Sequence, residues 1–91
     1  MSLYQVNKLC YDLKLATNRE AYQADPRGYL RRYHLDEDER TALDARDYAW
    51  LFDHGVNFLV LSTFATQNGV AGLPAMIDVM REQYESMETE G

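Results

Sequence analysis

The most apolar stretch of the sequence runs Phe58-Leu59-Val60-Leu61-Ser62-Thr63-Phe64-Ala65-Thr66. Its hydrophobic side chains fall on every side of a helical wheel, and only the serine and the two threonines are mildly polar. A helix that is apolar all round has to be buried all round. The stretch therefore predicts a central helix over about residues 58–67, covered either by the rest of this chain or in part by another protein.

The rest of the chain divides into short helical segments with good stop signals between them. Val6, Leu9, Cys10 and Leu13 recur at helical spacing and form one apolar stripe. No segment alternates polar and apolar residues as a strand would. Together the patterns predict helices over about residues 3–15, 17–24, from 26, 37–54, 58–67 and from 73 onward.

The predicted fold class is therefore all-α: a small single-domain bundle of about five to six short helices around a central apolar helix. With 91 residues, the chain has room for one domain only, over 1–91. Its last part, 84–91, is acidic, and we expect it to fray.

Several helix ends carry specific signals. Gly55 follows the predicted helix 37–54, and we expect it to end that helix in a left-handed conformation. Polar residues that can accept hydrogen bonds from free backbone N–H groups stand where helices begin. The candidate capping residues are Thr17 with Glu20, Asp25 with Pro26 at the first helical position, Asp36 with Glu39, and Asn57.

Charge and composition exclude several classes of function. The net charge of −6 argues against binding nucleic acid or a membrane surface. The one basic patch is Arg27, Arg31 and Arg32, and we interpret it as a solvated face or a contact for an acidic partner. Cys10 is the single cysteine, so no internal disulfide can form, and the N-terminus lacks a signal-peptide pattern. We expect a cytoplasmic protein.

The chain shows no recognisable catalytic apparatus. His34 and His54 lie on different segments, in no metal-binding spacing, and structural or surface roles are favoured for both. Cys10 lies on an apolar stripe with no basic neighbour, which is typical of an inert buried thiol. No nucleophile elbow, P-loop, dinucleotide fingerprint or zinc-protease helix occurs. We expect this chain to bind neither a metal nor a cofactor.

One carboxylate is oddly placed. If residues 37–54 form a single helix, Asp47 interrupts an apolar face that also carries Leu43, Trp50, Leu51 and His54. A buried carboxylate needs a partner, and we expect that partner to be distant in sequence. An internal salt bridge or a capping contact is favoured over a contact across a subunit interface, but both interpretations stay open.

Four motifs occur in the order seen in a known family. They are Val6-Asn7-Lys8-Leu9-Cys10-Tyr11-Asp12-Leu13, Asn18-Arg19-Glu20, Ala24-Asp25-Pro26-Arg27-Gly28-Tyr29-Leu30, and Ala45-Arg46-Asp47-Tyr48 followed by Leu51, Gly55, Asn57 and Phe58. In these motifs the chain resembles the LigA-like alpha subunits of protocatechuate 4,5-dioxygenase-type enzymes. The likeness runs from about residue 3 to residue 80.

The resemblance implies a heteromeric extradiol dioxygenase. In that family, the large beta subunit carries the Fe(II) site and the catalytic base, and the small subunit covers the active-site mouth. The expected partners of this chain are thus a large catalytic subunit and an aromatic diol substrate at the interface. We expect Asp47, Trp50, Phe58, Leu61 and Phe64 to contact the large subunit, and replacing Phe64 with Asp to hinder association or folding.

A loop in the last third of the family's small subunit approaches the substrate. The matching residues here are Asn68, Gly69, Val70, Ala71, Gly72 and Leu73. Relatives often continue with Lys-Ser-Phe, whereas this chain has smaller and more apolar residues. The resemblance then implies a bulkier or less acidic substrate, such as a biaryl or aminobiphenyl diol.

Two other functions remain alternatives. One is a free-standing helical interaction or regulatory module with the same fold and no dioxygenase partner. The other is a small metalloenzyme that uses His34, His54 and an acidic residue. The neighbouring open reading frame separates the first alternative from a dioxygenase subunit, and metal analysis of the purified chain tests the second.

Overall fold

The computed structural model describes residues 3–90, with side chains through residue 87. These residues form seven α-helices and no strand, which confirms the all-α class. The seven helices are one more than the upper expectation because the predicted helix 37–54 is two helices. In order they are α1 (Leu3–Asp12), α2 (Ala16–Ala24), α3 (Pro26–Leu30), α4 (Glu37–Ala45), α5 (Tyr48–Asp53), α6 (Phe58–Thr66) and α7 (Leu73–Glu90).

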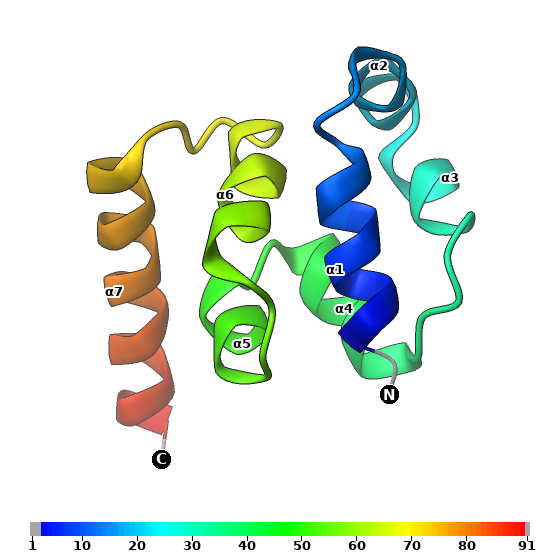
Figure 1. The fold of residues 1–91 in the computed structure, drawn as a ribbon. Helices are drawn as coiled ribbons and strands as arrows, with labels where there is room; N and C mark the ends of the chain where they lie inside the picture. The colour runs from blue at the N-terminus through cyan, green and yellow to red at the C-terminus, as the bar shows by residue number, and fades with distance from the viewer. Residues whose placement is uncertain (1–2, 91) are drawn as a thin grey trace.

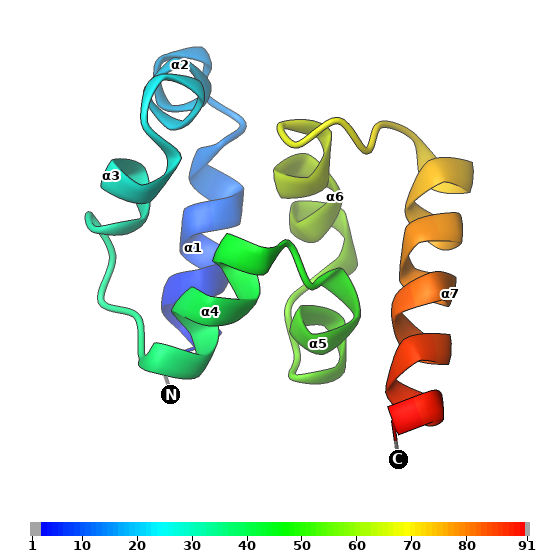
Figure 2. The same cartoon turned by 180° about the vertical axis from the view of Figure 1, so that it is seen from behind.

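The helices are arranged around α6. Figure 1 shows α6 between α7 on one side and α1 on the other, with α2 and α3 beyond α1. In the reverse view, α4 and α5 come to the front (Figure 2). Helix α6 packs against α1, α5 and α7. The prediction of a central apolar helix is confirmed.

The core forms where these helices meet. Leu61, Phe64 and Ala65 of α6 have no exposed surface. The Phe64 ring is met edge-on by Tyr22 of α2, at 5.7 Å between ring centroids, and by Tyr48 of α5, at 6.2 Å. Such edge-to-face pairs are favoured because the positive edge of one ring meets the negative face of the other. The predicted stripe on α1 is confirmed by the full burial of Val6, Leu9, Cys10 and Leu13.

Three of the four predicted caps are confirmed. The Asp25 carboxylate accepts from the backbone N–H of Gly28 at 3.2 Å, with Pro26 at the first helical position. Asp36 and Glu39 form a complete capping box, with N···O distances of 2.8 and 2.9 Å. The Asn57 side chain accepts from the N–H of Leu59 and begins α6.

The predicted start of the second helix at Thr17 is wrong. Helix α2 begins at Ala16, and its N-cap, Leu15, makes no side-chain hydrogen bond. The Asn18 side chain instead donates to the carbonyl of Asp12, at 2.9 Å, and Arg19 donates to that of Leu13. These bonds add donors to the carbonyls at the end of α1, which stops at Asp12, earlier than the predicted residue 15.

The prediction of one long helix over 37–54 is also wrong. Arg46 adopts a left-handed conformation, with φ 56° and ψ 45°, and ends α4. The Asp47 side chain then accepts from the backbone N–H of Trp50 at 3.2 Å and begins α5. Asp47 therefore does not interrupt an apolar helix face. It caps a new helix, so the capping interpretation is confirmed and the expectation of a distant partner is wrong.

The final helix extends further than predicted. Helix α7 is the longest at 18 residues, and it runs through the predicted frayed tail to Glu90; residue 91 lies outside the described part. The Tyr84 hydroxyl ties this part of α7 to α5 by donating to the Asp53 carboxylate at 2.7 Å. The left-handed conformation predicted for Gly55, at the end of α5, is confirmed by its φ of 107°.

One α7 side chain holds the junction between α4 and α5. Gln83 donates from Nε2 to the carbonyl of Arg46, at 3.0 Å, and accepts at Oε1 from the N–H of Ala49, at 2.9 Å. A single amide thus provides an acceptor for the N–H of Ala49 and a second donor, beside the N–H of Tyr48, for the carbonyl of Arg46. The break and the packing of α7 are coupled through this residue.

We predict that Gln83→Ala lowers the free energy of unfolding by about 1–3 kcal/mol, because the N–H of Ala49 loses its partner and the carbonyl of Arg46 loses one of two. Urea unfolding followed by circular dichroism measures the change. Replacing the exposed neighbour Glu82 with Ala is the matched control and should change stability by less than about 0.5 kcal/mol. Equal stability of the two variants would contradict this role of Gln83.

Candidate functional site

The motif Ala45-Arg46-Asp47-Tyr48 lies at the break between α4 and α5, and its side chains are structural. Arg46 takes the left-handed position, and its Nε donates to Asn68 Oδ1 at 2.6 Å. Asp47 caps α5, and Tyr48 packs in the core with 1% of its surface exposed. In a non-glycine residue the left-handed conformation costs about 1–2 kcal/mol, so neighbouring contacts have to hold it.

Asn68 connects the motif to the predicted substrate loop. Its Oδ1 accepts from Tyr22 Oη, at 2.9 Å, as well as from Arg46, and its Nδ2 donates to the carbonyl of Phe64 at 3.0 Å. One side chain therefore joins α2, the α4–α5 junction and the end of α6. The first residue of the loop is held rigidly, and its polar groups are used inside the chain.

The remaining loop residues turn the chain towards α7. Gly69 and Gly72 have φ of 87° and 90°, a region that favours glycine. Val70 is half-buried and Ala71 is exposed, while Leu73 exposes 58% of its surface. The loop thus offers mainly small and apolar groups to whatever lies outside it. Its approach to a substrate stays a prediction.

The residues predicted to contact the large subunit differ in their exposure to solvent. Leu61 and Phe64 have no exposed surface because they pack against the chain's own helices, so the expectation that they touch a partner is corrected. Asp47, Trp50 and Phe58 are half-buried, and contact through them stays a prediction. The Phe64→Asp change would accordingly act on folding.

Sequence reasoning missed three strongly exposed apolar or aromatic side chains. Leu59 on α6 is 73% exposed, and Tyr4 and Tyr11 on α1 are 67% and 59% exposed. The spacing of seven between the two tyrosines places them on one side of α1, opposite the buried stripe, and this signal was available. A helical wheel that is apolar on every side could not single out Leu59.

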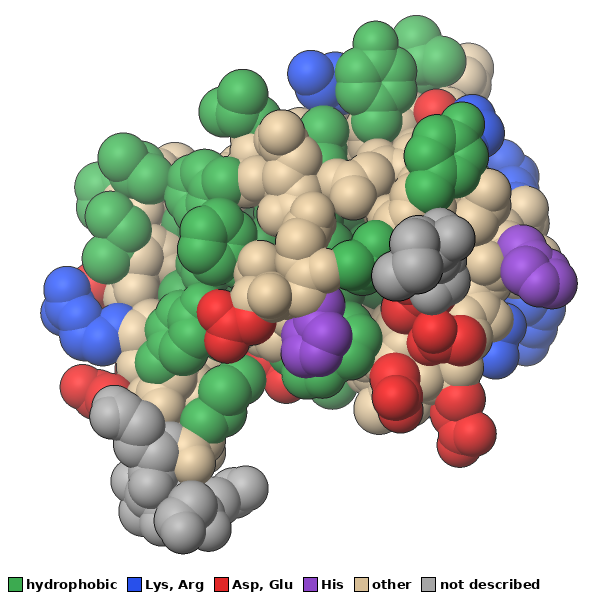
Figure 3. Space-filling view, turned by 60° about the horizontal axis from the view of Figure 1, so that its bottom comes forward, with side chains coloured by type: hydrophobic (Ala, Val, Ile, Leu, Met, Phe, Trp, Pro, Cys, Tyr) green, Lys and Arg blue, Asp and Glu red, His purple; other side chains and the backbone are tan. Residues whose placement is uncertain are grey.

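Two separate hollows are lined in part by residues at the start of α6. One, of about 530 Å³, lies between α1 and α6 and is lined by Tyr4, Tyr11 and Leu59 among others. The other, of about 510 Å³, lies between α6 and α7 and is lined by Phe58 and Ile77 among others. In Figure 3, hydrophobic side chains gather over α6 and α7, and again over the α1 side. We call Tyr4, Tyr11, Phe58, Leu59 and Ile77 together the contact face.

The candidate chemical groups lie apart from one another. The Cys10 thiol is buried, and burial raises its pKa to about 12, which keeps it protonated and unreactive. His54 stacks on the Trp50 ring at 3.8 Å between centroids, and His34 lies exposed before α4. Among the described residues, no three His, Cys, Asp or Glu side chains are placed to hold a metal ion.

A comparison with known protein families shows which family the chain belongs to. The family model described as "Aromatic-ring-opening dioxygenase LigAB, LigA subunit" matches residues 6–88, most of the chain. The chain belongs to the LigA family. It is thus a LigA-type small subunit of an aromatic-ring-opening dioxygenase, and the family implies a LigB large subunit as its partner.

The family match confirms the resemblance given by the four motifs. No solved structure matches this LigA chain. No helix within the described residues is both long enough and apolar enough to cross a membrane. The side chains of the described residues do not fit the Fe(II) that the family resemblance implies, because no suitable group of ligands comes together.

The Tyr48 hydroxyl gives a test of the structural role of the motif. It is buried without a hydrogen-bond partner among the described residues, and burial raises the pKa of Tyr48 to about 12. We predict that Tyr48→Phe leaves the free energy of unfolding unchanged or raises it by about 1 kcal/mol, because an unsatisfied buried hydroxyl is costly.

Tyr22→Phe is the matched comparison, because the Tyr22 hydroxyl does bond to Asn68. This variant should lose about 1 kcal/mol of stability by the same urea measurement. If Tyr48→Phe proves the more damaging of the two, the Tyr48 hydroxyl has a partner or a role that the fold does not explain.

Proposed function

We propose that this chain is the non-catalytic small subunit of a heteromeric, iron(II)-dependent extradiol dioxygenase, and that it covers the active-site mouth of the large subunit. The observation that carries the proposal is the exposed Leu59 on a largely apolar helix, in a chain of the LigA family. In this proposal the Fe(II) and the catalytic base belong to the large subunit. This chain contributes a surface that contacts the large subunit and covers its active-site mouth.

The contact face fits such a partner. Leu59, Tyr4 and Tyr11 line one hollow, and Phe58 and Ile77 line the other, so apolar and aromatic groups lie on both sides of the start of α6. Aromatic and aliphatic anchors in hollows are typical of the centre of a specific interface, which buries about 800 Å² on each partner. We infer that the large subunit covers this face.

The chain would assist ring cleavage without itself making or breaking a bond. A lid over the active-site mouth excludes water and holds the substrate in a reactive position. The loop from Asn68 to Leu73 is the segment we assign to this task. Its anchoring through Asn68 to two helices and the α4–α5 junction gives it the fixed position that a lid requires.

The composition of the loop also bears on the substrate. Because Val70, Ala71 and Gly72 offer no charged or aromatic side chain, the loop cannot pair with the carboxylate of an acidic catechol. We propose an aromatic diol that is bulkier or less acidic, such as a biaryl or aminobiphenyl diol, bound at the interface. The alternative of a free-standing helical module would leave the contact face uncovered.

We predict that Leu59→Asp weakens copurification with the co-expressed large subunit at least about 10-fold, because a carboxylate would have to be buried in an apolar contact. Leu59 is 73% exposed, so the isolated variant should fold as the wild type does, with the same circular dichroism spectrum. Thr41→Asp, an exposed change on α4 of equal charge, is the control. Wild-type copurification of Leu59→Asp would place the partner elsewhere.

We further predict that the reconstituted complex prefers a biaryl catechol to protocatechuate, with a ratio of kcat/KM of at least about 10. Steady-state oxygen uptake on both substrates measures the ratio. Replacing Val70 with Lys should narrow the ratio by favouring the acidic substrate, and Ala24→Lys on α2 controls for added charge. A clear preference of the wild type for protocatechuate would refute the substrate assignment.

A further inference from the structure

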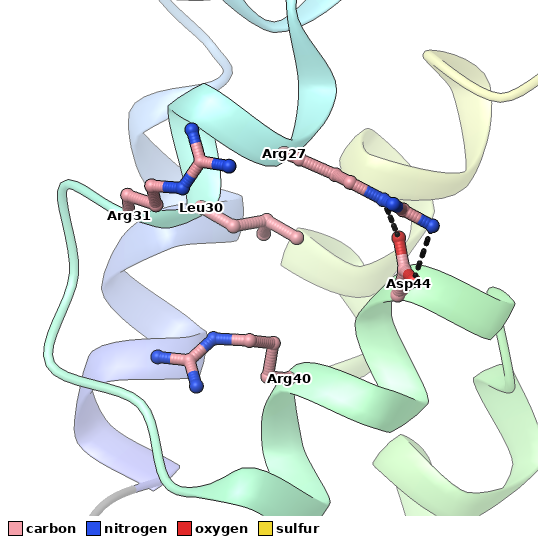
Figure 4. Close-up of a pocket in the computed structure, with 5 residues that line it drawn as sticks. All are labelled: Arg27, Leu30, Arg31, Arg40 and Asp44. Atoms are coloured by element: carbon pink, nitrogen blue, oxygen red, sulfur yellow. Dashed lines mark hydrogen bonds and ion pairs between the residues drawn. The ribbon is translucent and has the colours of Figure 1, made fainter.

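A cavity between α3 and α4 has a charge opposite to that of the whole chain. It has a volume of about 390 Å³ and is lined by Arg27, Leu30, Arg31, Arg40 and Asp44. Figure 4 shows the arginines of α3 and its end on one side and Arg40 and Asp44 of α4 on the other. Three guanidinium groups and one carboxylate give a local charge of +2, in a chain whose net charge is −6.

Some of the guanidinium N–H groups that line the cavity already have hydrogen-bond partners in the chain. Arg27 holds Asp44 through two parallel bonds, Nε to Oδ1 at 3.3 Å and Nη2 to Oδ2 at 3.2 Å. Arg40 donates one Nη2 bond to the carbonyl of Leu35 at 3.4 Å. Among the described residues, the Arg31 guanidinium has no hydrogen-bond or ion-pair partner. Most donors of Arg31 and Arg40 thus remain available to a ligand.

The lining indicates the chemistry of that ligand. Guanidinium groups bind carboxylates through paired N–H bonds, as Arg27 does with Asp44 in the same cavity. Leu30 is 4% exposed and adds an apolar wall beside the arginines. An apolar wall favours a hydrocarbon stem over a fully hydrated inorganic ion.

We propose that the cleft between α3 and α4 binds paired carboxylates on a hydrocarbon stem, through Arg31 and Arg40. Such carboxylates occur in free dicarboxylic acids and in the Asp and Glu side chains of another protein. The site is independent of the contact face at α6 and of ring cleavage. Its test therefore succeeds or fails separately from the proposed function.

The test is isothermal titration of the full chain at an ionic strength of about 0.15 M, where the Debye length is about 8 Å and charges outside the cleft are screened. Glutarate is the free dicarboxylate, a short peptide with two glutamates represents a protein segment, and inorganic phosphate is the third probe. We expect saturable 1:1 binding of glutarate, the peptide or both. Binding of glutarate assigns the cleft to a free acid, and binding of the peptide alone assigns it to a protein segment.

Variants locate the binding. Arg31→Gln and Arg40→Gln should each weaken it at least about 10-fold, because a charge-assisted bond contributes more than a neutral one. Arg32→Gln removes the same charge one residue away, outside the cavity lining, where the guanidinium lies over the Tyr29 ring. This control should bind within about twofold of the wild type, since exposed charges act weakly at a distance.

Three results would overturn the proposal. They are the absence of saturable binding to both carboxylate probes, an equal loss in Arg32→Gln and Arg31→Gln, and phosphate binding as tight as that of glutarate. The last two would show a general positive field rather than a carboxylate site.

Discussion

The burial of α6 is the constraint on which the rest of the structure depends. Its side chains are apolar on nearly every side, so water has to be excluded around most of its circumference. Helices α1, α5 and α7 do this on three sides, and Phe64 at the centre is closed off by two tyrosines. The chain does not cover Leu59. We infer that a partner subunit covers this exposed part of the helix.

The break between α4 and α5 is what allows this enclosure. A straight helix through residues 37–54 could not direct α5 onto both α6 and α7, as the structure does. The left-handed Arg46 turns the chain, Asp47 begins the new helix, and Gln83 and Asn68 satisfy the backbone and side-chain groups at the turn. The motif Ala45-Arg46-Asp47-Tyr48, one of the four that carry the LigA resemblance, thus forms a structural corner. The same corner fixes the start of the loop that we assign to the substrate.

The sequence predicted most helix starts from local signals, except at Thr17, and it failed where the deciding contact is distant. The stripe on α1, the capping box at Asp36 and the cap at Asn57 involve residues a few positions apart, and all were confirmed. At the corner the cap from Asp47 to the N–H of Trp50 is local. Arg46 also depends on Asn68 and Gln83, which are 22 and 37 residues away and which no local pattern could reveal. For the same reason the exposed side of α6 could not be found before the covering helices were placed.

We propose a division of labour in which the large subunit is catalytic and this small one covers part of its surface. Ring-cleavage assays by oxygen uptake test this directly, with this chain alone, the large subunit from the neighbouring open reading frame alone, and the two recombined. We predict no turnover by this chain, and at least about 10-fold faster turnover by the recombined pair than by the large subunit alone. Ring cleavage by the purified small chain, or a large subunit whose rate is unaffected by it, would contradict the account.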